Sequence, residues 1–281
     1  MLLKAVAAFL VLIIVVAGYL FASYRLAVSD AERAWTEIAR TAVPPPGVFD
    51  PAMVSGLPEV AQRYFLHAIA PGTPLKTTVE LRLKGVFLLG DKNSSQSYDM
   101  EARQILAPPD KFVWMPVLRS GPLTITGSDA VLDGRAWMRF WIASLFPVAD
   151  IPTSPDLVCS AQFRSAIESI WAPAAILPRD GIAWKAVGPD TASVTIDLPG
   201  GPVVLQFTLD QAGALKAVVG LRWSDANPQK RFQLQPFGGT MEEEATFDGY
   251  TIPSVVKVGN MFGTADYCAF YQAQILQAVY K

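Results

Sequence analysis

Histidine, cysteine and catalytic motifs are scarce in this sequence. Its 281 residues include a single histidine, His67, and two cysteines. Any catalytic triad, Cys-His pair or metal site that needs a histidine must therefore use His67. The sequence contains no G-x-S-x-G elbow, no H-E-x-x-H pair and no P-loop lysine signature. These absences exclude the enzyme classes that such motifs mark, and they predict neither a metal nor another cofactor.

Charge is also sparse. Charged residues make up 17% of the chain and the formal net charge is -2, with an isoelectric point near 5.5. Binding to nucleic acid needs a basic surface, so the composition predicts no nucleic-acid partner. Cys159 and Cys268 are too few for a disulfide framework. Two interpretations of this pair stay open: two small buried thiols, or one disulfide formed in an oxidising compartment.

Charge is missing altogether from residues 5–22. A helix over this run would be about 27 Å long, close to the hydrocarbon thickness of a bilayer. We interpret residues 1–25 as a single-pass transmembrane anchor in the cell membrane. A cleaved signal peptide is the alternative, but the run is longer than the apolar core of such peptides and no A-x-A triplet follows it. The Lys and Arg residues around the run do not decide its orientation, and the short preceding tail favours an extracytoplasmic domain.

Residues 26–56 connect this anchor to the rest of the chain. Ser29 and Glu32 have the spacing of a capping box, which predicts a separate juxtamembrane helix that begins there. The prolines at 44–46 and Gly47 end that helix and predict a stiff linker. A β-rich globular domain is expected over residues 57–281.

Alternating apolar and polar residues dominate this domain. Apolar residues at 79, 81 and 83 alternate with charged residues at 80, 82 and 84, a pattern typical of a half-buried antiparallel strand. One helix is expected over residues 159–171. Residues 135–148 fit both a helix face and a strand, and Asp133-Gly134 favours the strand because it is typical of a hairpin turn. Further strands are expected at residues 98–106, 112–115, 123–126, 191–198, 203–209, 215–223, 241–247, 254–261 and 267–280.

The predicted fold class is α+β, mostly antiparallel β. We expect an N-terminal transmembrane helix followed by a curved antiparallel sheet, an incomplete β-barrel, packed with one or two helices. The concave face of such a sheet must be filled by a helix or by a ligand. The sequence is rich in large aromatic and Met side chains, which line hydrophobic pockets but also fill ordinary cores. The ligand-binding candidates are Trp114, Met115, Trp171, Phe237, Tyr250, Arg63, His67 and Glu243.

Three of these candidates are charged or titratable. Arg63 and His67 are four residues apart, so they share one face of a predicted helix. Glu243 faces away from Glu242 and Glu244 if all three lie on a strand. A carboxylate on the concave side would need a partner and could serve as a general acid or base. Glu168 is a second acid/base candidate, although its helical spacing from Arg164 is typical of an ordinary surface ion pair.

The stretch from residue 236 to residue 253 carries a family resemblance. Its P-F-G-G string at residues 236–239, the three glutamates, Phe247, Gly249-Tyr250 and Ile252-Pro253 resemble the signature of an uncharacterised bacterial family, known only as a domain of unknown function. The resemblance extends from about Leu57 to the C-terminus and implies no activity. The predicted architecture is more distantly similar to LolA/LppX-like lipoprotein carriers, which hold acyl chains against a concave apolar sheet.

We therefore expect a membrane-anchored, non-enzymatic domain that binds a lipid or another hydrophobic molecule. The membrane and such a ligand are its expected partners. An envelope enzyme that uses one of the glutamates at 242–244, or Glu168, as acid or base is one alternative. A structural or assembly protein is another, and an exposed apolar patch in place of a pocket would favour it.

Overall fold

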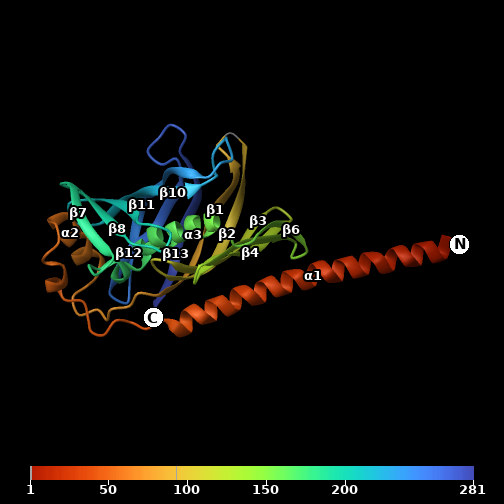
Figure 1. Ribbon diagram of the computed structural model, residues 1–281, viewed down its shortest axis with the longest axis horizontal. Helices are drawn as coiled ribbons and strands as arrows, with labels where there is room; N and C mark the ends of the chain where they lie inside the picture. Colours follow the sequence, from red (N-terminus) through yellow and green to blue (C-terminus); the bar gives the residue numbers. More distant parts are fainter. Residues whose placement is uncertain (1, 93) are drawn as a thin grey trace.

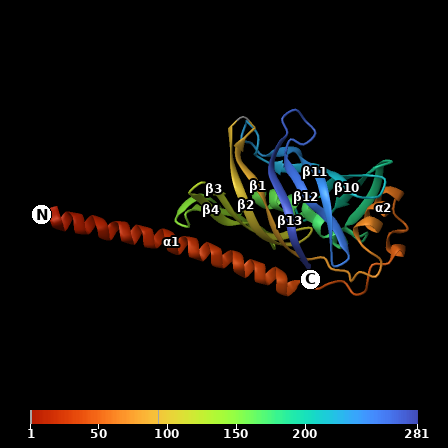
Figure 2. The same cartoon turned by 180° about the vertical axis from the view of Figure 1, so that it is seen from behind.

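One antiparallel sheet of 13 strands forms the body of the molecule in the computed structural model, which describes residues 2–92 and 94–281. The strands are ordered β6-β5-β4-β3-β2-β1-β13-β12-β11-β10-β9-β8-β7, so the sheet is two runs of hairpins that meet where β1 pairs with β13. It is curved and open, with β6 and β7 as its edges (Figures 1 and 2). The strands are β1 (Val79–Asp91), β2 (Ser94–Ala107), β3 (Lys111–Ser120), β4 (Leu123–Leu132), β5 (Arg135–Ile142), β6 (Phe146–Ile151), β7 (Ile182–Gly188), β8 (Thr191–Ile196), β9 (Val203–Leu209), β10 (Leu215–Ser224), β11 (Gln233–Phe247), β12 (Tyr250–Asn260) and β13 (Cys268–Tyr280).

The expected fold class is confirmed, with differences in individual strands. Residues 135–148 are strand, as the Asp133-Gly134 turn between β4 and β5 favours, but they form two strands, β5 and the start of β6, in place of one. The sequence does not predict β7, which is short and ends at a glycine, or the first part of β11. Residues 233–240 include Pro236 and two glycines, residues that are depleted in strands and so weaken the pattern.

A helical segment crosses from β6 to β7 inside the curve of the sheet (Figure 1). It consists of α3 (Pro155–Ile167), η2 (Glu168–Trp171) and η3 (Pro173–Ile176). α3 begins four residues before the expected start at 159, because the Ser154 side chain accepts a hydrogen bond from Leu157 N and Pro155 occupies the first turn. The segment divides the concave side of the sheet and leaves space beside it.

α1 (Leu2–Thr41) is one continuous helix of 40 residues. The expectation of a separate helix beginning at Ser29 is wrong, because residues 23–30 contain no proline or glycine to interrupt the helix. Ser29 lies inside the helix, where its hydroxyl accepts a hydrogen bond from Arg33 Nη1 at 3.3 Å. α1 ends before the prolines at 44–46, as predicted, and its N-terminal half projects far beyond the domain (Figures 1 and 2).

The C-terminal half of α1 packs on the outer face of the sheet. Small side chains at Ala31 and Ala34, together with Ile38, allow the helix to approach β2–β5 closely. They pack against Ile105, Val113, Ala130, Leu132 and Trp137. Ion pairs of Glu32 with Arg103 and of Asp30 with Arg139 flank this contact. The projecting half of α1 is thereby held in a defined direction relative to the sheet.

Two short helices close the far end of the domain. η1 (Pro51–Val54) follows Asp50, whose carboxylate accepts a hydrogen bond from Ala52 N, and α2 (Glu59–Ala68) follows Pro58. Tyr64 and Phe65 of α2 pack edge-to-face on Trp184 of β7 and Phe207 of β9. This aromatic cluster fills the concave side at the β7–β9 end.

Candidate functional site

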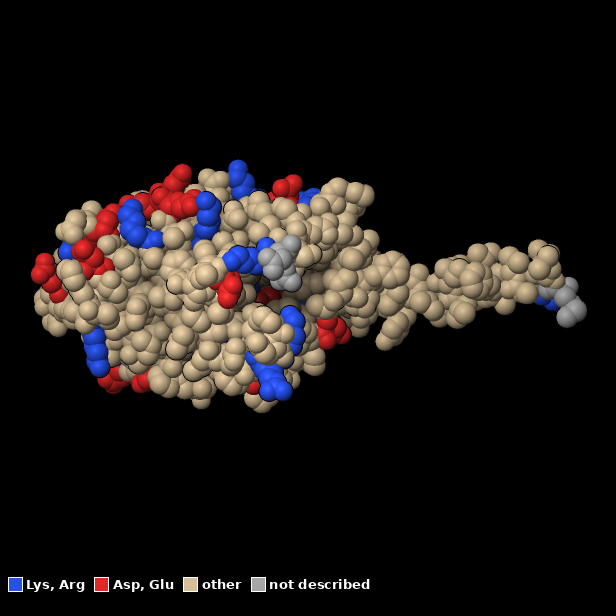
Figure 3. Space-filling model, turned by 90° about the horizontal axis from the view of Figure 1, so that it is seen from above, with Lys and Arg blue, Asp and Glu red and all other residues tan. Residues whose placement is uncertain are grey.

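A cavity of about 480 Å³ lies between the concave face of the sheet and the segment α3–η2. Its volume falls within the range of roughly 300–1,000 Å³ that is usual for small-molecule sites. Seen from above, the domain is hollowed near its middle, toward the projecting helix (Figure 3). The lining is predominantly apolar and includes Phe87, Leu89, Trp114, Leu118, Ile125, Met138, Phe140, Val148, Ile167, Ile170, Trp171, Val218, Phe237, Val258, Phe270 and Tyr271.

Strand alternation places the aromatic side chains of this lining. The ring of Trp114 on β3 lies 5.8 Å from that of Phe87 on β1 and 6.2 Å from that of Tyr271 on β13. Every second residue of a strand faces the same side, so neighbouring strands in register bring these rings together on the concave face. The result is a continuous apolar wall from β5 through β1 to β13.

A buried charged cluster lies at one side of this apolar wall. Arg164 of α3 donates from Nη1 to Asp129 Oδ2 at 2.5 Å and from Nε to Glu168 Oε1 at 2.8 Å. The second Glu168 oxygen accepts a hydrogen bond from Gln104 Nε2 at 2.5 Å. Burial by itself lowers the pKa of Arg164, but the carboxylates of Glu168 and Asp129 raise the pKa above its ordinary value. Arg164 therefore stays charged and holds both carboxylates in place.

Arg222 of β10 is a second guanidinium in the cavity wall. Its Nε donates to Ser160 Oγ at 3.0 Å, and its guanidinium carbon lies 5.0 Å from the centre of the Phe237 ring. Burial lowers the pKa of Arg222 to about 10, which still leaves the side chain positively charged near neutral pH. Unlike Arg164, Arg222 forms no ion pair with any described residue.

Three of the candidates from the sequence line the cavity: Trp114, Trp171 and Phe237. Trp171 Nε1 donates to the Pro253 carbonyl at 3.0 Å, which fixes the indole against the sheet. Phe237 packs edge-to-face on Phe163 of α3 and is the ring beneath Arg222.

Met115 and Tyr250 lie elsewhere. Met115 faces the outer side of β3 and packs beside α1, because it follows the inward-facing Trp114 in the strand. Tyr250 is fully buried and its ring stacks on that of Tyr280 at 4.1 Å. Its hydroxyl donates to the Pro74 carbonyl at 2.8 Å, so this tyrosine ties the loop after α2 to the sheet.

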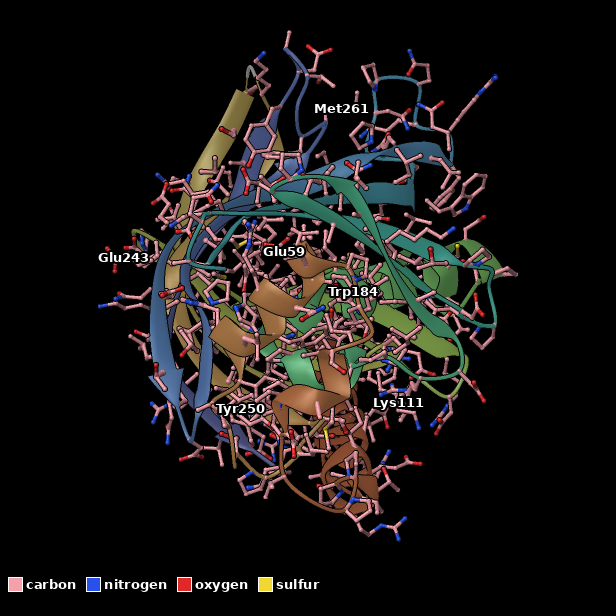
Figure 4. All side chains as sticks on the ribbon, turned by 90° about the vertical axis from the view of Figure 1, so that its left-hand side faces the viewer. Glu59, Lys111, Trp184, Glu243, Tyr250 and Met261 are labelled. Atoms are coloured by element: carbon pink, nitrogen blue, oxygen red, sulfur yellow. The ribbon has the colours of Figure 1, made fainter. Side chains whose placement is uncertain are left out.

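Arg63, His67 and Glu243 also lie outside the cavity. Arg63 Nη2 pairs with Asp190 Oδ1 at 2.8 Å, and His67 Nε2 lies 2.9 Å from Glu244 Oε2. The three glutamates at 242–244 are all exposed, and Glu243 lies on the outer side of the sheet (Figure 4). Glu243 does not face away from its two neighbours as expected, because the pairing of β11 with β12 shifts register on both sides of this residue.

Sequence reasoning missed the polar residues of the cavity, Asp129 and Arg222, and placed Arg164 and Glu168 on the surface. The helical spacing of Arg164 and Glu168 is correct, but their side chains are only 12% exposed because α3 lies inside the curved sheet. Asp129 lies in the part of β4 beyond the expected end at residue 126. If β4 had been predicted to its full length, Asp129 would have stood out as an acidic residue at an inward strand position.

Neither the cysteines nor the acidic residues form a metal centre or disulfide in the described part of the chain. Cys159 and Cys268 are free thiols. No group of three or more His, Cys, Asp or Glu side chains that could hold a metal ion is found in residues 2–92 and 94–281.

Comparison with known sequences identifies the family. Residues 47–272 match a family of unknown function, DUF6544. The chain belongs to this family. The resemblance expected from the sequence is thereby confirmed, and membership of DUF6544 carries no established activity. No curated protein matches the chain significantly.

Three crystal structures similar to this DUF6544 chain share little sequence with it. A domain described as an outer membrane lipoprotein-sorting protein, from Vibrio parahaemolyticus, has 10% identity and a TM-score of 0.41, with 79% of this chain and 91% of that chain covered. A LolA superfamily protein from Nitrosomonas europaea has 7% identity and a TM-score of 0.41, with 79% and 92% covered. A DUF1329 family protein from Desulfovibrio piger has 10% identity and a TM-score of 0.32, with 73% and 86% covered.

Proposed function

We propose that this DUF6544 protein is a membrane-anchored, non-enzymatic domain that binds a lipid or another hydrophobic molecule in the cavity between its curved sheet and α3. The observation that carries the proposal is the cavity itself, whose walls are predominantly aliphatic and aromatic. Apolar walls offer water few hydrogen bonds, whereas an apolar ligand that fills the cavity buries this surface away from water, which is favourable.

Anchoring is supported by the composition and exposure of α1. Among the described residues, this is the helix long and apolar enough to cross a membrane by length and composition, and its most apolar window is not buried against the domain. In this proposal residues 1–25 span the bilayer, residues 26–56 connect, and residues 57–281 form the binding domain. The domain side is proposed to be extracytoplasmic, and labelling of a Gln211→Cys variant by a membrane-impermeant maleimide in intact cells, with both native cysteines replaced by serine, tests this.

The β5–β6 hairpin would bring the cavity close to the bilayer. Tyr24, two residues beyond the apolar run, lies 5.7 Å ring to ring from Trp141 of β5. Phe146, Val148 and Ile151 of β6 are exposed, and Val148 also lines the cavity. β6 lies beside α1 where the helix leaves the domain (Figure 1). These side chains support a route for an apolar ligand between bilayer and cavity along the apolar positions of β6.

The acid/base alternative has less support. The glutamates at 242–244 are exposed and do not line the cavity. Glu168 does line the cavity, but Arg164 and Gln104 occupy both of its oxygens. The bonding of Glu168 is that of a structural ion pair.

Native mass spectrometry of the full chain, released from membranes in detergent, tests the proposed function. We expect bound lipid on the native protein and uptake of added lipid after delipidation. Ala149→Trp, which fills the cavity from β6, should reduce the bound fraction about tenfold. Ala183→Trp on the exposed side of β7 is the matched control. A native chain that carries no lipid and takes up neither fatty acid nor phospholipid would contradict the proposal.

A further inference from the structure

The cavity contains hydrogen-bond donors that no acceptor of the described chain satisfies. Arg222 has five N–H donors, of which Nε alone has a partner, Ser160 Oγ. Its guanidinium rests on the Phe237 ring at 5.0 Å, at a position in the cavity wall. The two Nη groups are therefore available to a molecule in the cavity.

Two further donors belong to residues of the same wall. Trp114 Nε1 and Tyr271 Oη are buried and have no hydrogen-bond partner among the described residues. Trp114 is 3% exposed and Tyr271 is 8% exposed, and their rings lie 6.2 Å apart. Leaving a buried donor unpaired costs about 1–3 kcal/mol, so a bound acceptor would recover part of this free energy.

The other charged groups in the cavity already satisfy one another. Asp129 and Glu168 both accept from Arg164, and Gln104 donates to the remaining Glu168 oxygen. Arg222 lies beyond ion-pair distance of either carboxylate in the described structure, although both attract it at longer range. The group that the cavity lacks is therefore an acceptor beside Arg222.

We infer that the ligand of this cavity is an amphiphile with an anionic oxygen head group, a carboxylate or a phosphate, which Arg222 binds while the acyl part lies along the apolar wall. The inference rests on the proposed function and adds the chemical class of the ligand. A guanidinium matches the two oxygens of a carboxylate or phosphate, and such charge-assisted bonds are about twice as strong as neutral ones. A neutral sterol or hydrocarbon would leave Arg222 unpaired.

Photocrosslinking of the full chain in phosphatidylcholine vesicles at pH 8 tests this inference. The probes are hexadecanoic acid and hexadecanol with the same diazirine in the chain, and phosphatidic acid and diacylglycerol with that same acyl chain. Labelling of cavity peptides from β3, α3 and β13 is measured by mass spectrometry. We expect at least one anionic probe to label these peptides about tenfold more than its neutral counterpart.

The variants assign this preference to Arg222. Arg222→Met removes the charge and should bring the anionic-to-neutral ratio close to one, whereas Arg222→Lys should retain most of the preference. Arg119→Met, on an exposed strand position, is the matched control and should leave the ratio unchanged. Melting temperatures of all variants establish that they fold, and the Lys variant keeps the test valid if the Met variant unfolds.

The outcomes separate the two proposals. A preference for the acid or for phosphatidic acid that depends on Arg222 supports the inference and identifies the head group as carboxylate or phosphate. Equal labelling by anionic and neutral probes, or a ratio that Arg222→Met leaves unchanged, overturns the inference and leaves the hydrophobic ligand standing. Absence of cavity labelling by every probe overturns both.

Discussion

The two faces of strands β3–β5 are covered in different ways. On the outer face, α1 lies close against the sheet, because Ala31 and Ala34 present almost no side chain at the contact. On the inner face, α3 reaches the same strands through polar contacts, since Arg164 pairs with Asp129 of β4 and Ser165 Oγ donates to the Lys111 carbonyl of β3. A cavity of about 480 Å³ remains beside these contacts. Adjacent residues illustrate this: Met115 packs beside α1, while Trp114 lines the cavity. One face of these strands is thus covered closely by α1, whereas the other encloses the cavity that we propose binds the ligand.

The largest effect is expected inside the cavity, at Arg164. Arg164→Met leaves Asp129 and Glu168 buried without their common partner, so the free energy of unfolding should fall by about 3–5 kcal/mol. Thermal unfolding of the full chain in detergent measures the change. Arg119→Met removes an exposed partner of Glu101 and should change stability by less than about 1 kcal/mol. Equal effects of the two substitutions would mean that the inner cluster is not insulated from water.

The next effect tests the outer face. Ala31→Leu forces a larger side chain between α1 and the sheet and should destabilise this contact by about 1–3 kcal/mol. Hydrogen exchange of residues 27–38 should increase while ligand binding in the cavity is preserved. Thr36→Leu places the same side chain on the exposed side of α1 and serves as the control. Loss of ligand binding in Ala31→Leu would contradict the separation of the two faces.

A smaller difference is expected between the two tryptophans of the cavity. Trp171→Phe removes the donor that the Pro253 carbonyl accepts, whereas Trp114→Phe removes a donor without a partner. Trp171→Phe should therefore destabilise the apo protein by about 1 kcal/mol more than Trp114→Phe. Melting temperatures of the delipidated variants compare them. The reverse order would show that Trp114 Nε1 has an acceptor in the ligand-free protein.

The smallest effect is expected at the pair of His67 and Glu244, which lies outside both covered faces. Glu244→Gln should change the free energy of unfolding by less than about 1 kcal/mol, because the carboxylate is 42% exposed and screened by solvent. Lipid binding should remain at the native level. A loss of lipid binding in this variant would indicate that the binding site includes this exposed pair and not the cavity alone.

Much of the architecture follows from local pattern. Alternation at residues 79–84 predicts β1, and the Asp133-Gly134 turn predicts the β4–β5 hairpin. The inward positions of Trp114, Trp171 and Phe237 could be predicted from the sequence, because large aromatic residues favour enclosed surfaces. The burial of Arg164 could not be predicted, because its i, i+4 spacing from Glu168 is the same on an exposed helix and on an enclosed one.

The sequence by itself determined the long apolar helix, the antiparallel class of the sheet and the family, because helix length, strand alternation and motif strings are local properties. Only the tertiary structure decided that the helix continues onto the outer face and that α3 lies inside the curve. It also decided that Arg222 reaches a cavity without a partner. Those features depend on contacts between residues far apart in the chain, and no pattern within one segment records which face of the sheet a helix will cover.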